Sequence, residues 1–372
     1  MLITDRSALT KYFSNRRVWQ GIPAIEITKG GRIFSAFYSG GTKEEIDNFS
    51  VVVKSDDGGE SFCEPLLAVF KQGHRCYDPC LWIDPYGRLW FIFALAPHHA
   101  VYATICEDPD ADTVVFGEPF KIGEEVMMNK PCVLSSGEWL FPIAVWRNDN
   151  LTVPGGFISD KTGDDRRAFA YATRDGGKSF VRLGGAAAEG RTYDEHMLLE
   201  LSDGRIAMYI RTAYGIAVCY SNDGGNSFSE PVDSGLLGPN SRFFIAKLKS
   251  GRILLVNHYK YSGRSHLTAM LSEDDGASFP YKLLLDERSN VSYPDAKEAD
   301  DGFIYITYDR ERGGFKSSLD EVYASAREIL FAKITEDDII RGEVGEDSRL
   351  RQVISRLGKY EGADPFASEG EK

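Results

Sequence analysis

The segment SNDGGNSF at residues 221–228 decides the fold, because the chain repeats its pattern three more times. The other copies are SDDGGESF at 55–62, TRDGGKSF at 173–180 and SEDDGASF at 272–279. Asp can accept hydrogen bonds from the amides that follow it, and Gly supplies the positive φ of a tight turn. We call this segment the Asp turn. Four copies predict a fold built from repeated units.

The spacing of the repeats predicts the number of units. The Asp turns are separated by 118, 48 and 51 residues, measured between the aspartates Asp57, Asp175, Asp223 and Asp274. A second pattern, a Gly that leads directly into an apolar strand, occurs six times, at Gly31, Gly87, Gly137, Gly204, Gly251 and Gly302. A period near 50 residues is typical of a four-stranded propeller blade. We therefore predict an all-β, six-bladed β-propeller of four-stranded antiparallel blades, with a β-sandwich or two smaller domains as the alternative.

The expected domain organisation is a single propeller over residues 1–345 and a C-terminal tail, helical or irregular, over residues 346–372. Within the tail, the segment RLRQVISRL at 349–357 has the spacing of a short amphipathic helix. Residues 9–13 are expected to form the outermost strand of the last blade and so close the ring.

Composition excludes several classes of protein. The net charge of −13 argues against a nucleic-acid surface. No segment approaches the roughly 18 apolar residues that a membrane helix needs, and the first residues do not resemble a secretory signal. The cysteines lie mostly in apolar segments, as in a reduced, cytoplasmic protein. Cys76 and Cys80 lack the second pair that a zinc site requires, so neither a metal nor another cofactor is expected.

Charged and phenolic residues open the first strands of most blades. Because the first strand of each blade lines the central channel, these residues are expected to meet in a polar pocket at one end of it. They are Asp78, Lys130, Glu195, Arg242 and Tyr293. In blade 4 the hairpin turn centres on Asp203, which places Glu195 opposite Arg211 as an ion pair.

Three longer segments resemble the sialidase superfamily. The first runs from Asp194-Glu195-His196 to Arg211, the second is Arg264-Ser-His-Leu-Thr, and the third is Ser292-Tyr293 with the strand at 301–308. Members of that superfamily carry Asp turns of this form on a six-bladed propeller. The resemblance covers residues 18–312.

The resemblance implies a site for a sugar whose anomeric carbon bears a carboxylate. Tyr293 would be the nucleophile, since a neutral phenol is not repelled by that carboxylate, and Glu195 would take its proton. Arg211 and Arg264 would bind the carboxylate.

An acid on a loop of blade 1 would protonate the leaving oxygen. The loop offers Asp47, Glu44 and Glu45, among which the sequence does not choose.

The chain departs from the sialidase pattern in two ways. Where the family has an Arg at the entrance of blade 1, this chain has Gly21, and Arg16 and Arg17 come too early to replace it. The rim charges Asp78, Lys130 and Arg242 are additional, and we assign them to substrate binding.

Three functions follow from these patterns. The first is a retaining, exo-acting glycosidase of the sialidase type, with an acidic oligosaccharide or glycoside as its partner. The second is a lyase acting on uronates, in which Tyr293 or a histidine removes a proton while Lys130 and Arg242 neutralise the carboxylate. The third is a sugar-binding propeller without catalysis.

Overall fold

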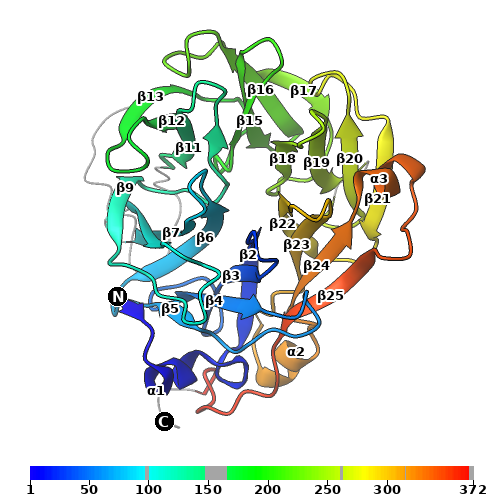
Figure 1. The fold of residues 1–372 in the computed structure, drawn as a ribbon. Coiled ribbons are helices and arrows are strands. Elements are labelled where there is room, and N and C mark those ends of the chain that lie inside the picture. The colour runs from blue at the N-terminus through cyan, green and yellow to red at the C-terminus, as the bar shows by residue number, and fades with distance from the viewer. Residues whose placement is uncertain (97–99, 147–165, 260–262, 315, 368–372) are drawn as a thin grey trace.

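The computed structural model describes residues 1–96, 100–146, 166–259, 263–314 and 316–367. These residues form six antiparallel sheets that surround a central axis as the blades of a propeller (Figure 1). Each blade is made of consecutive strands, and the chain passes from one blade to the next around the ring. The prediction of an all-β, six-bladed propeller is therefore confirmed.

The strands of the first three blades are as follows. Blade 1 contains β1 (Leu2–Ile3), β2 (Trp19–Ile27), β3 (Ile33–Gly40), β4 (Phe49–Ser55) and β5 (Leu67–Val69). Blade 2 contains β6 (Arg75–Ile83), β7 (Leu89–Ala96), β8 (Ala100–Cys106) and β9 (Phe120–Glu124). Blade 3 contains β10 (Cys132–Val133), β11 (Trp139–Ala144), β12 (Ala168–Thr173) and β13 (Val181–Ala186).

The other three blades repeat this arrangement. Blade 4 contains β14 (Met197–Glu200), β15 (Ile206–Thr212), β16 (Gly215–Ser221) and β17 (Val232–Leu236). Blade 5 contains β18 (Phe244–Lys247), β19 (Ile253–His258), β20 (Leu267–Ser272) and β21 (Tyr281–Asp286). Blade 6 contains β22 (Val291–Glu298), β23 (Ile304–Arg310), β24 (Glu328–Ile334) and β25 (Arg349–Arg356). The helical segments are α1 (Arg6–Leu9), η1 (Thr10–Tyr12), η2 (Ser14–Arg16), α2 (Leu319–Tyr323) and α3 (Glu336–Arg341).

The Asp turns join the third strand of a blade to its fourth and pack against the blade before. In the turn at 221–228, Asp223 accepts hydrogen bonds from the Ser227 amide at 2.9 Å and the Ser227 hydroxyl at 2.6 Å. A Cβ added at Gly177, in the equivalent turn of blade 3, would overlap the Trp90 ring of blade 2. The aspartates therefore hold turns at the outside of the blades, as their repetition predicts.

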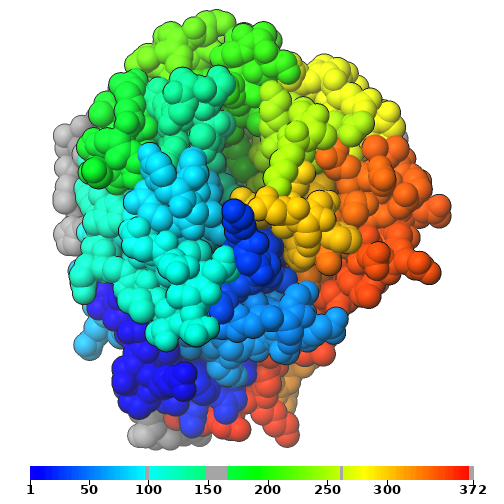
Figure 2. All heavy atoms as spheres, viewed as in Figure 1, coloured from blue at the N-terminus to red at the C-terminus, as the bar shows by residue number. Residues whose placement is uncertain are grey.

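The ring closes between blades 1 and 6 without sharing a strand. Strand β2 of blade 1 packs beside β22 of blade 6, and Figure 2 shows this blue strand against the gold one. Backbone amides cross the junction: Ile22 donates to Asp309 at 2.8 Å, Ile25 donates to Asp295 at 2.9 Å, and Gln20 donates to the Arg312 carbonyl at 3.2 Å. Side chains and amides thus replace the shared strand that we expected.

The two ends of the chain correct our predictions. Residues 9–13 are not a strand of the last blade, because the Asp5 side chain caps α1, accepting from the Ser7 and Ala8 amides at 3.0 Å, and the chain continues as 3-10 turns. The first residues instead pair with β5 at the outer edge of blade 1. The predicted helix at 349–357 is also wrong.

That segment forms β25, since a strand satisfies the free backbone groups along the edge of β24 and a helix could not. The last blade consequently extends into residues 346–372, which we had assigned to the tail.

Among the described residues, the helices are all too short or too polar to cross a membrane. The same residues contain no group of three His, Cys, Asp or Glu side chains arranged to hold a metal ion.

Candidate active site

Three blades present a strained residue to the axis in the same way. Ile22, Asp78 and Tyr293 each precede a proline in the first strand of blades 1, 2 and 6, and each has a positive φ, of 56°, 50° and 57°. The register of the strand shifts at each of these positions. Proline cannot donate to the ladder, so the strand forms a bulge there. Positive φ is costly for Ile and Tyr, and such strain is typical of functional sites.

The phenol of Tyr293 lies between a carboxylate and a guanidinium. Its hydroxyl donates a hydrogen bond to Glu195 Oε1 at 2.8 Å, and Arg211 Nη1 donates to the same hydroxyl at 3.2 Å. Arg211 Nη1 also lies 2.6 Å from Glu195 Oε2. The side chains of Glu195 and Arg211 are only 2% and 5% exposed. The three groups form one connected, water-shielded cluster, which contains the ion pair predicted from the hairpin of blade 4.

Burial and a neighbouring negative charge keep the phenol protonated. Burial raises the pKa of Tyr293 above its ordinary value, and the negative charge of Glu195 raises it further. Because the hydroxyl already points at Glu195, proton transfer to that carboxylate needs no rearrangement. The cluster can therefore generate a nucleophilic oxygen at the moment of reaction.

Asn240 fixes Arg211 and was missed by the sequence analysis. Arg211 Nε donates to Asn240 Oδ1 at 2.7 Å, and its Nη2 donates to the Asn240 carbonyl at 2.9 Å. These bonds leave Nη1 directed at Tyr293 and Glu195. Asn240 lies on a connection between blades 4 and 5, where no repeat pattern points to it.

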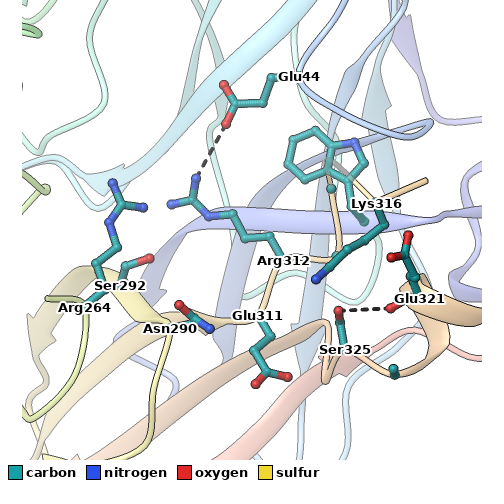
Figure 3. A pocket seen from close by; sticks show the side chains of 13 residues that line it. Glu44, Arg264, Asn290, Ser292, Glu311, Arg312, Lys316, Glu321 and Ser325 are labelled. Carbon is teal, nitrogen blue, oxygen red and sulfur yellow. Dashed lines mark hydrogen bonds and ion pairs between the residues drawn. The ribbon is translucent and has the colours of Figure 1, made fainter. Parts of the chain in front are cut away.

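Two further guanidinium groups flank the ring of Tyr293. The Arg264 guanidinium lies 5.2 Å from the ring centroid, as the resemblance implies. The Arg312 guanidinium lies 4.2 Å from the same centroid and was not predicted. Both arginines line a pocket of about 450 Å³ beside the cluster, and in Figure 3 their guanidinium groups lie close together, with Glu44 facing Arg312. Arginine side chains thus surround the phenol on several sides.

Arg242 and Lys130 do not reach this pocket, which corrects their assignment to substrate binding. Arg242 is fully buried and donates to Asn129 Oδ1 at 2.7 Å and to the carbonyls of Pro23 and Met128 at 3.1 and 2.9 Å. Its donors are therefore already used by the protein.

Lys130 donates to Glu26 Oε1 at 2.8 Å and to the Leu81 carbonyl at 2.6 Å, and its Nζ lies 3.1 Å from Asp295 Oδ2. It lines a different pocket, together with the ends of β2 and β22. Both cations hold blades together inside the channel.

The three carboxyl groups of the blade 1 loop have different surroundings. Asp47 is exposed and accepts a hydrogen bond from the Gly73 amide at 2.6 Å. Glu44 lines the pocket and lies 2.6 Å from Arg75 Nη2 and 3.5 Å from Arg312 Nη1. Glu45 is half-buried in the same loop. Of the three, only Glu44 is among the residues that line the pocket.

Asp78 has the environment of a neutral acid. It is 2% exposed, and burial raises its pKa to about 8. The negative charges of Glu44 and Glu195 act in the same direction, against the positive charge of Arg75. A carboxyl with such a pKa carries its proton at neutral pH and can donate it.

With this geometry established, comparison with known proteins gives the class of the protein. The BNR repeat-like domain family matches residues 31–306, and the chain belongs to this family. No curated protein matches the sequence.

Similar solved structures share the propeller. A protein of unknown function from Dyadobacter fermentans is 17% identical with a TM-score of 0.59, over 78% of this chain and 90% of its own. The Hadza microbial sialidase Hz136 is also 17% identical, with a TM-score of 0.61, over 78% of this chain and 63% of its own. The intramolecular trans-sialidase from Ruminococcus gnavus is 13% identical with a TM-score of 0.58, over 89% of this chain and 97% of its own. The fold is therefore that of sialidases.

Proposed function

We propose that the protein is a retaining exo-glycosidase of the sialidase type, acting on a terminal sugar that carries a carboxylate. The observation that supports it is the buried hydrogen bond of 2.8 Å from the Tyr293 phenol to Glu195, with Arg211 on the same two groups. A structural tyrosine has no need of a strained backbone or of several guanidinium neighbours. An arginine-rich, enclosed site suits a carboxylate ligand.

The reaction proceeds in two displacements. In the first, the Tyr293 oxygen attacks the anomeric carbon, its proton passes to Glu195, and the glycosidic bond breaks as the leaving oxygen receives a proton from an acid. In the second, water attacks the same carbon, returns a proton to the acid's conjugate base, and Glu195 gives its proton back to the phenolate. The sugar is released with its original anomeric configuration.

We propose Asp78 as the acid in place of Asp47. Asp78 stands at the same bulge position in blade 2 as Tyr293 in blade 6, and the charge of Glu195, the partner of Tyr293, contributes to its raised pKa. Asp47 accepts a hydrogen bond from the Gly73 amide, and Glu44 is paired with Arg75 and Arg312. Asp78 is a buried carboxyl whose surroundings favour the protonated form.

The lyase alternative loses both cations that were expected to neutralise the carboxylate, and one candidate histidine. Lys130 and Arg242 are bound inside the channel, as described above. His196 is buried with Nε2 2.8 Å from the Phe169 carbonyl, and burial lowers its pKa to about 4. The observations therefore favour glycoside hydrolysis.

The test is hydrolysis of an aryl glycoside of N-acetylneuraminic acid, with the anomeric configuration of the released sugar determined by NMR. We expect turnover with retention of configuration, and its loss in Tyr293→Phe because that variant has no nucleophilic oxygen. Tyr305→Phe is the matched control, since its phenol bonds Asp301 at 2.9 Å in the same blade but outside the site. Inversion of configuration, or full activity in Tyr293→Phe, would contradict the proposal.

A further inference from the structure

Gly21 leaves a space at the entrance of blade 1, and the side chain of Arg312 fills it. A Cβ built on Gly21 would lie 2.6 Å from Arg312 Cδ, 2.7 Å from Nε and 2.8 Å from Cγ. The φ of Gly21 is not positive, so its backbone conformation does not demand glycine. The glycine is required because another side chain passes through its place.

Arg312 is held so that one end of its guanidinium remains available. Its Nε donates to the buried Asp309 carboxylate at 2.8 Å, and Nη1 lies 3.5 Å from Glu44 Oε1. Nη2 is buried and has no hydrogen-bond partner among the described residues. A buried guanidinium donor without an acceptor is costly, and in a pocket it indicates the place of a ligand atom.

The arginines around Tyr293 differ in how far the protein neutralises their charge. Arg211 is paired with Glu195, whereas Arg264 makes no ion pair in the part of the chain that the structure describes. Arg264 and Arg312 extend into the same pocket from different blades, and their like charges repel (Figure 3). An anion bound between them relieves that repulsion.

We propose that Arg312 fills the place of the side chain that is missing at position 21 and forms with Arg264 a two-arginine site for the carboxylate of an acidic sugar, beside the Arg211–Glu195 pair. This inference rests on the proposed function for its ligand class, but it concerns binding and not turnover. The Arg312 guanidinium reaches the site from the connection between β23 and β24, and not from the first strand of blade 1. Gly21 and Arg312 therefore act as a pair, in which each residue requires the other.

The experiment measures how strongly the protein prefers an acid to its neutral ester. Dissociation constants are determined by calorimetry for N-acetylneuraminic acid and glucuronic acid, and for the methyl ester of each. The dissociation constant of the ester divided by that of the acid reports the carboxylate contact and is insensitive to a general weakening of the fold. For the preferred sugar, we expect the ratio to fall about 10- to 100-fold in Arg312→Ala, as for the loss of hydrogen bonds to a charged group.

Two further variants test the pairing of Gly21 with Arg312. Gly21→Ala should lower the ratio in the same way by displacing Arg312, and adding it to Arg312→Ala should change nothing more, because both changes remove one contact. The exchange Gly21→Arg with Arg312→Gly should restore most of the preference. Arg310→Ala is the matched control: Arg310 lies two residues away, with Nη1 3.3 Å from Glu328, and should leave the ratio unchanged.

An unchanged ratio in Arg312→Ala, with a lowered ratio in Arg264→Ala, would overturn the inference. A wild-type protein that binds acid and ester equally would overturn it as well. Failure of the proposed hydrolase activity appears separately, as the absence of turnover of the aryl glycoside while the binding preference is retained.

Discussion

Replacement of Arg211 by Met should reveal the cost of leaving Glu195 charged and unpaired. The Glu195 side chain is 2% exposed and has Arg211 Nη1 2.6 Å from Oε2. Removing one partner of a buried ion pair costs about 3–5 kcal/mol, because the other charge stays desolvated. Since unfolding entropy is roughly 2 cal/mol/K per residue, a chain of 372 residues should lose about 4–6 °C in melting temperature.

The assay is thermal and urea unfolding followed by near-ultraviolet circular dichroism at neutral pH. The double variant with Glu195→Gln is the decisive control, because it also removes the unpaired negative charge of Glu195. We expect it to recover more than half of the lost free energy of unfolding. If Arg211→Met is as stable as the parent, or if the double variant is no more stable than Arg211→Met, the ion pair does not have the energetic role that its burial implies.

Three other perturbations test separate parts of the structure. Asp78→Asn should slow the hydrolysis of alkyl glycosides about 10²- to 10⁴-fold and that of 4-nitrophenyl glycosides far less, since a good leaving group needs no acid. In the parent protein, the rate of alkyl glycoside hydrolysis should fall as pH rises through about 8, where Asp78 loses its proton. Equal slowing of both substrates would argue against an acid role. Hydrogen bonds from Ser227 hold the pKa of Asp223 below its ordinary value, so the contribution of Asp223 to stability is present above about pH 4 and is lost as pH falls. Melting temperatures measured between pH 3 and 7 should therefore depend less on acid in Asp223→Asn than in the parent protein. An unchanged pH profile would contradict this. Gly177→Ala should lower the free energy of unfolding in urea by about 1–3 kcal/mol more than Gly204→Ala, since both glycines have positive φ but only a Cβ at Gly177 meets a neighbouring ring, that of Trp90. Equal losses would show that packing of the turn on the preceding blade does not contribute to stability.

The blade count could be predicted because its determinants are local. An Asp turn needs only its own eight residues, and each hairpin glycine, such as Gly251 with a φ of 88°, specifies its turn without distant partners. The pairing of Glu195 with Arg211 was predictable for the same reason, since a symmetric turn fixes which residues face each other. Local chemistry repeated along the chain is visible in one sequence.

Other features depend on contacts that the spacing of the sequence repeats does not indicate. Arg242 and Lys130 were expected to open strands, but they lie two residues before β18 and β10. Whether a side chain there points to the pocket or into the channel depends on partners such as Asp295. Arg312 lies on an irregular connection and becomes significant only beside Gly21. The edge of β24, which recruits the segment at 349–356 as a strand, exists only once the blade is assembled.

Closure without a shared strand links activity to the integrity of the ring. The proposed nucleophile Tyr293 and Arg312 come from the last blade, whereas Gly21 comes from the first, so the candidate site straddles the seam. Because amide and side-chain bonds such as that of Ile22 to Asp309 hold the seam, a slight opening of the seam would displace these residues from one another while every blade stays intact. The expected turnover should therefore report whether the seam is closed, and on warming it should be lost before any loss of β-structure.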